Sequence, residues 1–341
     1  KLFGVTHECK YPDAAKLKPR VIYSVINSDE LTSNEINTVT CTLLRDGKDI
    51  FTLNEENLKN ANPDLIISQE TCEVCAAYTT QVKNALEILP KKPELYSMDP
   101  HNLNEIIQSV ITLGKILQQD QKALEIVKGL EKRIQNIKNS KTNILPKVLA
   151  IEWIEPFFTA GHWIPEMIEF AGGINLISKT GEHSRRMDMN EIVNSNPDII
   201  ILMPCGFNTK RTISEYNSIL KENSAWNSLN AVKNNQIFAV DANSFFSKPS
   251  IRTVEGLEIL AKIIQSEKFV NLMKEGTLLN NISAAYPYTF GAMNSMFTGL
   301  FGKENGVDSY YKMFRLKDSV DFLPEILQNH GYFTSCDLIS D

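Results

Sequence analysis

Several residues of the types that bind metals or react as thiols stand close together along this sequence. His7 and Cys9 are one residue apart, Cys72 and Cys75 have Cys-x-x-Cys spacing, and Cys205 lies in a later loop. This spacing suits metal ligands, but a structural zinc site usually combines two such pairs, so one pair is a weak signal. Three interpretations of Cys72 and Cys75 stay open: metal ligands, a disulfide or redox pair, and thiols without a ligand.

The stretch 151–173 has a different character, because it brings four aromatic side chains together with a glutamate and a histidine. These residues are Glu152, Trp153, Phe157, Phe158, His162 and Trp163. The apolar run before Glu152 predicts a buried strand, and Pro165 followed by apolar residues at helical spacing predicts a helix ending at Gly172-Gly173. Open α/β sheets hold ligands at the carboxyl ends of their strands, so this aromatic loop is predicted to line a binding site.

The elements that must position these loops occur twice. Asn62–Ile67 reads NPDLII and Asn196–Ile201 reads NPDIII, and a cysteine-bearing loop follows each run. A repeat of this kind predicts two similar α/β lobes. Between them, apolar residues keep helical spacing from Leu103 to Ile137, which predicts one helix about 45 Å long.

We therefore predict an α/β protein with two Rossmann-like lobes joined by one long helix, plus a C-terminal α/β fragment. The predicted bounds are 1–100 for the first lobe, 101–142 for the linking helix, 143–267 for the second lobe and 268–341 for the fragment. One linking helix would leave the lobes little freedom to hinge.

Composition excludes several classes of function. A net charge of −6 argues against nucleic acid or an anionic membrane as the main partner. No apolar run approaches the length of a spanning helix, and the first residues lack the basic and apolar regions of a signal peptide. The two lobes show neither a glycine-rich phosphate loop nor a nucleophile elbow, so we expect no enzymatic activity from them. A monomer is expected.

Residues 1 to about 266 resemble the cobalamin-binding branch of the single-helix-hinged substrate-binding proteins of ABC importers. The motifs that carry the resemblance are Gly4-Val5-Thr6-His7-Glu8-Cys9 with Tyr11-Pro12, Pro63-Asp64-Leu65-Ile66-Ile67 with Cys72 and Cys75, Glu152-Trp153, Ala160-Gly161-His162-Trp163, Pro197-Asp198, Pro204-Cys205-Gly206, and Phe245-Phe246-Ser247-Lys248-Pro249 with Arg252. One departure is that the family normally begins with one more strand and helix, carrying an Arg-x-x-Ser…Pro…Thr-Glu pattern that this sequence lacks.

The resemblance implies a corrinoid held between two lobes and delivered to an importer permease outside the cytoplasm. Cobalamin would be the transported ligand, and no other cofactor is implied. A wide, flat macrocycle suits aromatic faces, and its amide rim suits polar partners. The predicted ligand-binding residues are His7, Glu8, Cys9, Tyr11, Gln69, Cys72, Cys75, Glu152, Trp153, Phe157, His162, Trp163, Pro204, Cys205, Phe245, Phe246 and Arg252.

Two alternative functions stay open. The first is a receptor for a metal ion or a metal chelate of the siderophore type, using His7, Cys9, Cys72, Cys75 and Cys205. The second, the less favoured, is a sulfatase- or phosphatase-type hydrolase acting through the tail, which resembles the early part of a sulfatase/alkaline-phosphatase-type domain with Thr289 at the nucleophile position. That fold needs metal-binding carboxylates and histidines for which this sequence has no room, so we expect an inert fragment or an extension packed on the second lobe.

Overall fold

The structure is a computed structural model that describes residues 1–70, 79–140 and 144–265. The chain divides into two units, Lys1–Leu272 and Met273–Asp341. The second unit, with Thr289, lies outside the described residues, and so do Cys72 and Cys75. None of the helices in the described ranges has the length and apolar character needed to cross a membrane.

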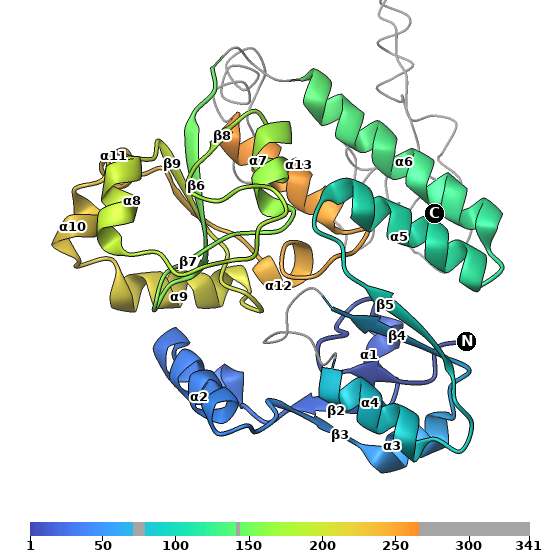
Figure 1. Cartoon of the computed structure of the whole chain (residues 1–341). Helices are drawn as coiled ribbons and strands as arrows, with labels where there is room; N and C mark the ends of the chain where they lie inside the picture. Colours follow the sequence, from blue (N-terminus) through green and yellow to red (C-terminus); the bar gives the residue numbers. More distant parts are fainter. Residues whose placement is uncertain (71–78, 141–143, 266–341) are drawn as a thin grey trace, which may run out of the picture. The chain divides into compact units, whose positions relative to one another are not determined.

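The sheet of the C-terminal half, called lobe two here, is built around strand β6 (Lys147–Trp153) (Figure 1). Its strand order is β10-β9-β6-β7, and β8 pairs with β6. β6 is parallel to β8 and β9, β9 is parallel to β10, and β7 is antiparallel to β6. The other strands are β7 (Phe158–Thr159), β8 (Ile174–Asn175), β9 (Ile199–Leu202) and β10 (Ile237–Ala239).

Both faces of this sheet are covered, because alternate side chains of β6 enter two different hydrophobic clusters. Val148 and Ala150 belong to one cluster, and Leu149 and Ile151 belong to the other. Period-two alternation sends successive side chains to opposite faces, and a strand covered on both faces is apolar throughout. The predicted buried strand before Glu152 is therefore confirmed. The helices of lobe two are α7 (Ile164–Phe170), α8 (Met189–Ser195), α9 (Thr209–Ile219), α10 (Ser224–Asn227), α11 (Asn230–Lys233), α12 (Ala242–Phe245) and α13 (Thr253–Ile264).

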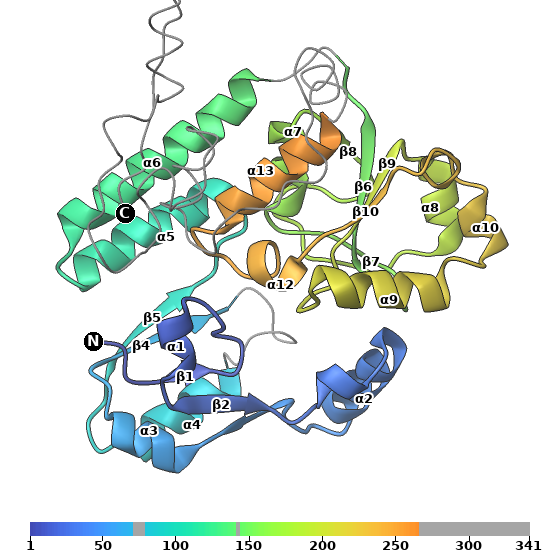
Figure 2. The same cartoon turned by 180° about the vertical axis from the view of Figure 1, so that it is seen from behind.

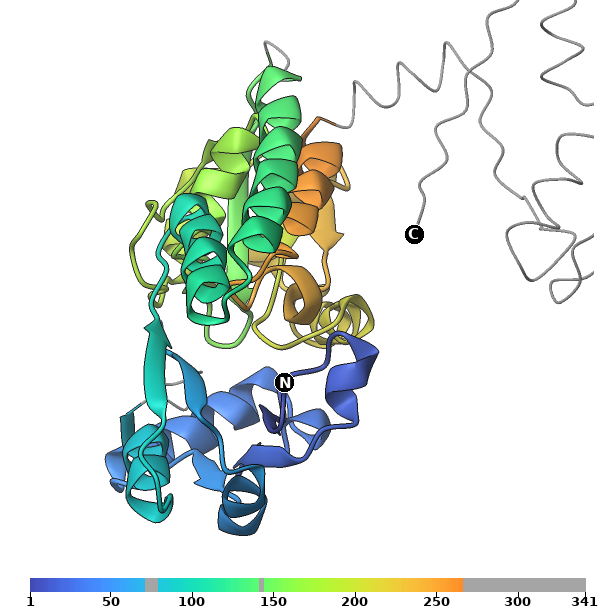
Figure 3. The same cartoon turned by 90° about the vertical axis from the view of Figure 1, so that its right-hand side faces the viewer.

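The single linking helix is the clearest wrong prediction. The segment forms two helices, α5 (Leu103–Ile116) and α6 (Asp120–Asn139), which pack against each other. The chain turns between them at Gln118, which has a φ of +55°. A Cβ on Gly114 would lie 2.3 Å from the Cβ of Ala123, so only glycine permits this approach. Figure 3 shows α6 beside α13 of lobe two, and buried residues of both helices belong to the same hydrophobic cluster.

The N-terminal half, called lobe one here, contains two separate sheets among the described residues. One has the order β1-β2-β3, and the other contains β4 and β5 (Figure 2). β1 is parallel to β2, β3 is antiparallel to β2, and β4 is parallel to β5. The strands are β1 (Val5–Thr6), β2 (Arg20–Ser24), β3 (Phe51–Leu53), β4 (Leu65–Gln69) and β5 (Glu94–Met98). The helices are α1 (Asp13–Lys16), α2 (Ser33–Arg45), α3 (Glu55–Ala61) and α4 (Thr79–Ile88), with a 3₁₀ turn at Ser28–Glu30.

The predicted sequence repeat corresponds to a structural repeat. β4 and β9 both follow a helix that ends in a left-handed asparagine, Asn62 or Asn196. Each strand then pairs in parallel with the next strand along the chain, β5 or β10. The lobes differ at one place: β9 also pairs with β6, whereas within the described part of lobe one β4 pairs with β5 alone. Within the described part of lobe one, β2 is the middle strand of its own sheet, and no strand joins that sheet to the pair β4-β5 as β6 joins the strands of lobe two.

Candidate functional site

Loops from the two lobes meet at Arg252, which begins α13. Its guanidinium carbon lies 4.4 Å from the ring centroid of Tyr11 in lobe one and 4.5 Å from that of Phe245 in lobe two. A guanidinium at this distance from aromatic rings is attracted by their π faces. Beside it, the Lys248 ammonium lies 2.8 Å from the Glu8 carboxylate. We call Glu8, Tyr11, Phe245, Lys248 and Arg252 the Arg252 cluster.

One ion pair of this cluster, between Glu8 and Lys248, joins the two lobes. Burial alone would raise the pKa of Glu8, but the charge and hydrogen bond of Lys248, with the charge of Lys10, hold that pKa below its ordinary value. The neighbouring His7 is half-buried, and burial lowers its pKa despite the charge of Glu8. At neutral pH the cluster therefore presents one carboxylate, two cations and two aromatic rings. Four of its five members are predicted site residues; the fifth, Lys248, lies in the quoted Phe245–Pro249 motif.

Three histidines form a second group near the crossing between the lobes. The ring centroids of His162 and His183 are 5.1 Å apart, and His101 lies 6.0 Å from His162 and 5.8 Å from His183. The Nε2 atom of His101 lies 3.2 Å from the Asp99 carboxylate. The Nδ1 atoms of His101 and His162 are buried, and neither has a hydrogen-bond partner among the described residues. We call these three residues the histidine cluster.

Backbone geometry brings the histidines together. His162 has a φ of +54°, which is uncommon for a residue other than glycine. Its backbone N–H donates to the carbonyl of Glu182 (2.7 Å), and its carbonyl accepts from the N–H of Gly181 (2.9 Å). His101 follows β5 in the segment that joins it to α5. Of these three histidines, only His162 is among the residues predicted from the sequence; the position of His101 shortly after the strand β5 is a signal that could have found it.

The free energy of unfolding is expected to fall as the pH is lowered from 6.5 toward 4. Burial, with His183 and His101 as further causes, lowers the pKa of His162 from 6.5 to about 4. Between these values the unfolded chain binds a proton that the folded chain does not, so acid favours unfolding. The full shift would correspond to about 3 kcal/mol, and solvent screening at a half-buried ring reduces this to about 1–2 kcal/mol.

Urea denaturation at pH 7 and pH 4.5 measures this loss. His162→Asn is the matched variant, because asparagine adopts the left-handed backbone readily and does not titrate in this range. Between the two pH values, the free energy of unfolding of this variant should fall by about 1–2 kcal/mol less than that of the wild type. An equal loss in both proteins would show that His162 does not carry the effect.

Glu152 holds the loop that carries His183. Its carboxylate accepts hydrogen bonds from the Ser184 hydroxyl (2.6 Å) and from the Gly161 N–H (3.4 Å). Burial raises the pKa of Glu152, and these two hydrogen bonds only partly oppose that shift. Glu152 therefore lies next to the histidine cluster, and its Oε2 atom accepts both hydrogen bonds from the protein's own loops.

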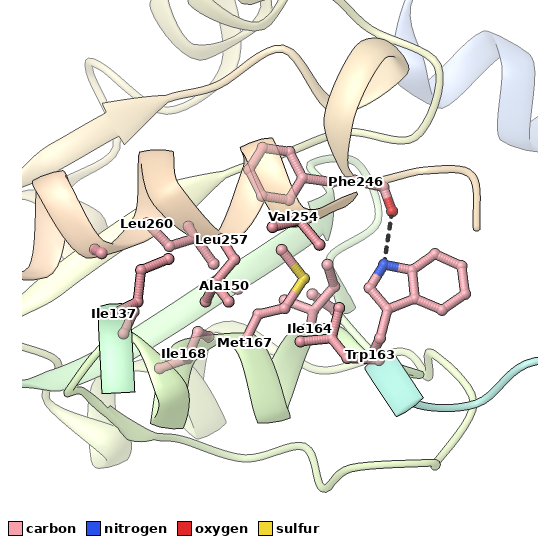
Figure 4. Packing of buried hydrophobic residues seen from close by; sticks show 14 of the residues in the cluster. Ile137, Ala150, Trp163, Ile164, Met167, Ile168, Phe246, Val254, Leu257 and Leu260 are labelled. Carbon is pink, nitrogen blue, oxygen red and sulfur yellow. Dashed lines mark hydrogen bonds between the residues drawn. The ribbon is translucent and has the colours of Figure 1, made fainter. Parts of the chain in front are cut away.

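Several predicted ligand contacts prove to be packing residues. Trp163 and Phe246 are each 3% exposed, and the Trp163 indole N–H donates to the Phe246 carbonyl (3.2 Å) inside the core shown in Figure 4. Phe157 stacks on the fully buried Trp226, with centroids 6.1 Å apart, and Pro204 is buried. The assignment of Trp163, Phe246 and Pro204 to the ligand surface is corrected accordingly, since composition does not reveal which side of a sheet an aromatic residue covers; Phe157 is partly buried, and its assignment stays a prediction.

The remaining predicted residues are spread more widely. Trp153 is half-buried, and its indole N–H donates to the carbonyls of Ser33 and Glu155, each at 3.2 Å. Gln69 ends β4 and is half-buried. Cys9 is an exposed free thiol and Cys205 a partly buried one. Within the described ranges, no three His, Cys, Asp or Glu side chains are placed to hold a metal ion.

Comparison with known proteins identifies the family. The family described as Periplasmic binding protein matches residues 2–244. A curated relative, the high-affinity heme uptake system protein IsdE of Staphylococcus aureus (strain MRSA252), is 25% identical over 199 residues, which is 56% of this chain and 64% of that protein. The chain therefore matches less than two thirds of the length of this curated relative.

Solved structures share the fold at lower identity. One is described as a possible iron-binding (periplasmic solute-binding) protein from Staphylococcus epidermidis ATCC 12228, with a TM-score of 0.56, 23% identity, and coverage of 77% of this chain and 90% of that one. Another is the periplasmic vitamin B12 binding protein BtuF of Vibrio cholerae, with a TM-score of 0.55, 20% identity, and coverage of 79% and 89%. The predicted α/β fold with two lobes is confirmed.

Proposed function

Because the chain belongs to the periplasmic binding protein family, we propose that its two lobes capture a corrinoid such as cobalamin outside the cytoplasm and deliver it to the permease of an ABC importer. The proposal selects one ligand class from those that the names of similar proteins mention, which are heme, iron and vitamin B12.

The observation that carries this proposal is the Arg252 cluster. Tyr11 from lobe one and Phe245 from lobe two lie on the Arg252 guanidinium, so the cluster combines flat faces with a cation at the place where the lobes meet. A corrinoid combines a wide apolar ring with an amide rim and a phosphate. Aromatic faces suit the ring, and Lys248 and Arg252 suit the phosphate.

Heme is the second candidate, and two observations favour it. Its two carboxylates would match the two cations of the cluster, and the curated relative IsdE is named as a heme uptake protein. A corrinoid and heme share the flat metal-centred macrocycle, so a direct comparison of the two ligands is needed.

Calorimetric titrations of the whole chain with cyanocobalamin and with hemin test the proposal. We expect cyanocobalamin to bind with a micromolar or lower Kd. Arg252→Ala should weaken this binding about tenfold, equivalent to about 1.4 kcal/mol, because the variant removes a cation that lies between two rings.

Arg185→Ala is the matched control, because Arg185 is an exposed arginine that pairs with Glu191. It should bind cyanocobalamin as the wild type does. Binding of hemin alone, weakened by Arg252→Ala, would transfer the assignment to heme. Failure of both ligands to bind, or equal effects of the two arginine variants, would contradict the proposal.

A further inference from the structure

Helix α2 (Ser33–Arg45) is an insertion of lobe one that reaches lobe two. It lies within residues 25–50, between the antiparallel strands β2 and β3. In Figures 1 and 2 it stands apart from those strands and close to α9. Ser33 is the one buried residue of this helix, and Val39 and Leu44 are 37% and 47% exposed. A helix that buries so little apolar surface depends on its few specific contacts.

The strongest of these contacts is made by Glu215 of α9 at the first turn of α2. The Ser33 backbone N–H donates to Oε1 of Glu215 (3.1 Å), and the Ser33 hydroxyl donates to Oε2 (2.8 Å). Ser33 is 0% exposed and Glu215 is 7% exposed. A carboxylate suits this position, because the first N–H groups of a helix have no partner within it and carry partial positive charge.

Two further lobe-two residues hold the same end of α2. The Arg211 guanidinium donates to the carbonyl of Leu31 (2.7 Å) while it lies 3.7 Å from the ring centroid of Phe207. The Trp153 indole N–H donates to the carbonyl of Ser33. Arg211 and Glu215 are four residues apart on α9, so they project from the same face of that helix.

The hydrogen-bond partners of α2 lie in lobe two rather than in lobe one, to which the helix is covalently connected. Arg186 of lobe two also donates to the Asn37 side chain (3.3 Å). Among the residues that the structure describes, every hydrogen bond that joins α2 to a residue outside segment 25–50 goes to lobe two. The helix belongs to lobe one by covalent connection and to lobe two by its contacts.

We propose that α2 is a docking strap, which means a helix of lobe one that binds to lobe two. The buried carboxylate of Glu215 in lobe two holds the first turn of this helix. Undocking of the strap is a local opening step, and it leaves the cores of both lobes intact. While docked, the strap links the lobes in addition to the covalent crossing between β5 and α5 and to the contacts of Arg252 with Tyr11 and of Lys248 with Glu8. This inference does not depend on the identity of the ligand.

Hydrogen–deuterium exchange of the whole chain, measured by mass spectrometry at pH 7, tests the strap. In Glu215→Ala we expect the amides of 33–45 to exchange at least tenfold faster than in the wild type. The peptides of α13 should be unchanged, because that helix lies in the core of lobe two. Glu222→Ala is the matched control, since Glu222 is exposed and lies just after α9; it should leave α2 protected.

A double-mutant cycle identifies the partner of Glu215. The double variant Ser33→Ala/Glu215→Ala should exchange in α2 no faster than Glu215→Ala alone, because the Ser33 hydroxyl has already lost its acceptor in the single variant. Three results would overturn the proposal: unprotected α2 amides in the wild type, equal exchange in Glu215→Ala and Glu222→Ala, or faster exchange in α13 to the same degree as in α2.

Discussion

Replacing Gly161 by alanine is expected to lower the free energy of unfolding by about 3 kcal/mol, at the upper end of the usual cost of overpacking. A Cβ at this position would lie 2.4 Å from the Glu182 carbonyl oxygen, 2.7 Å from the Ser184 nitrogen and 2.9 Å from the His183 carbonyl carbon. All three are backbone atoms, so no side-chain rotation relieves the contact. The loop 182–184 must move, and the bonds of Glu152 and His162 to that loop are lost with it.

Gly129→Ala is the matched control for this experiment. Gly129 lies in α6, and a Cβ there would have no neighbour within 4 Å. Because alanine favours helix over glycine, this variant should be neutral or stabilise by up to about 1 kcal/mol. Urea denaturation of both variants gives the comparison. If Gly161→Ala were as stable as Gly129→Ala, the loop 182–184 would move away from the new Cβ without loss of stability. Close backbone packing would then not hold the histidine cluster in place.

Truncation of Trp163 to alanine is expected to cost about 3–5 kcal/mol of unfolding free energy, the usual range for a large buried aromatic residue. Trp163 is 3% exposed and packs with Met167, Ile168 and Val254 in the core of Figure 4. The variant also leaves the Phe246 carbonyl without the indole N–H. Trp163→Phe should cost less, because it keeps most of the ring volume.

The measurement is urea denaturation followed by circular dichroism, without any ligand. Trp153→Phe is the control, because Trp153 is half-buried and its loss should cost about 1 kcal/mol through the hydrogen bond. If the free energy of unfolding of Trp163→Ala were within about 1 kcal/mol of the wild-type value, the assignment of Trp163 to the core would be contradicted. If that variant also lost cyanocobalamin binding, Trp163 would return to the set of ligand contacts.

Local signals predicted the elements of lobe two well. The run before Glu152 is apolar at every position, which is typical of a strand covered on both faces, and β6 has that environment. The apolar spacing of Thr253–Ile264 predicts α13 with the bounds that the structure has. The NPD motif marks the turn before β4 and before β9, because asparagine adopts the left-handed end of the preceding helix readily.

The linking helix shows where periodicity fails. Apolar spacing continues through Leu117–Gln119, and both halves of the segment present an apolar face. Spacing reports that a face is apolar and does not report the direction in which the chain runs. The reversal at Gln118 lets α5 and α6 bury their faces against the same lobe, and a straight helix would leave one of them exposed.

The α/β class and the repeat of β4 with β9 follow from the sequence, and four members of the Arg252 cluster are among its candidate residues. These features depend on residues that are close together in the chain or that follow a predicted strand. Only the folded structure shows that Trp163 and Phe246 are core residues, that His101 joins His162 and His183, and that α2 contacts lobe two. Each of these depends on which surfaces meet after folding, and contacts between residues far apart in the chain leave no spacing pattern in one sequence.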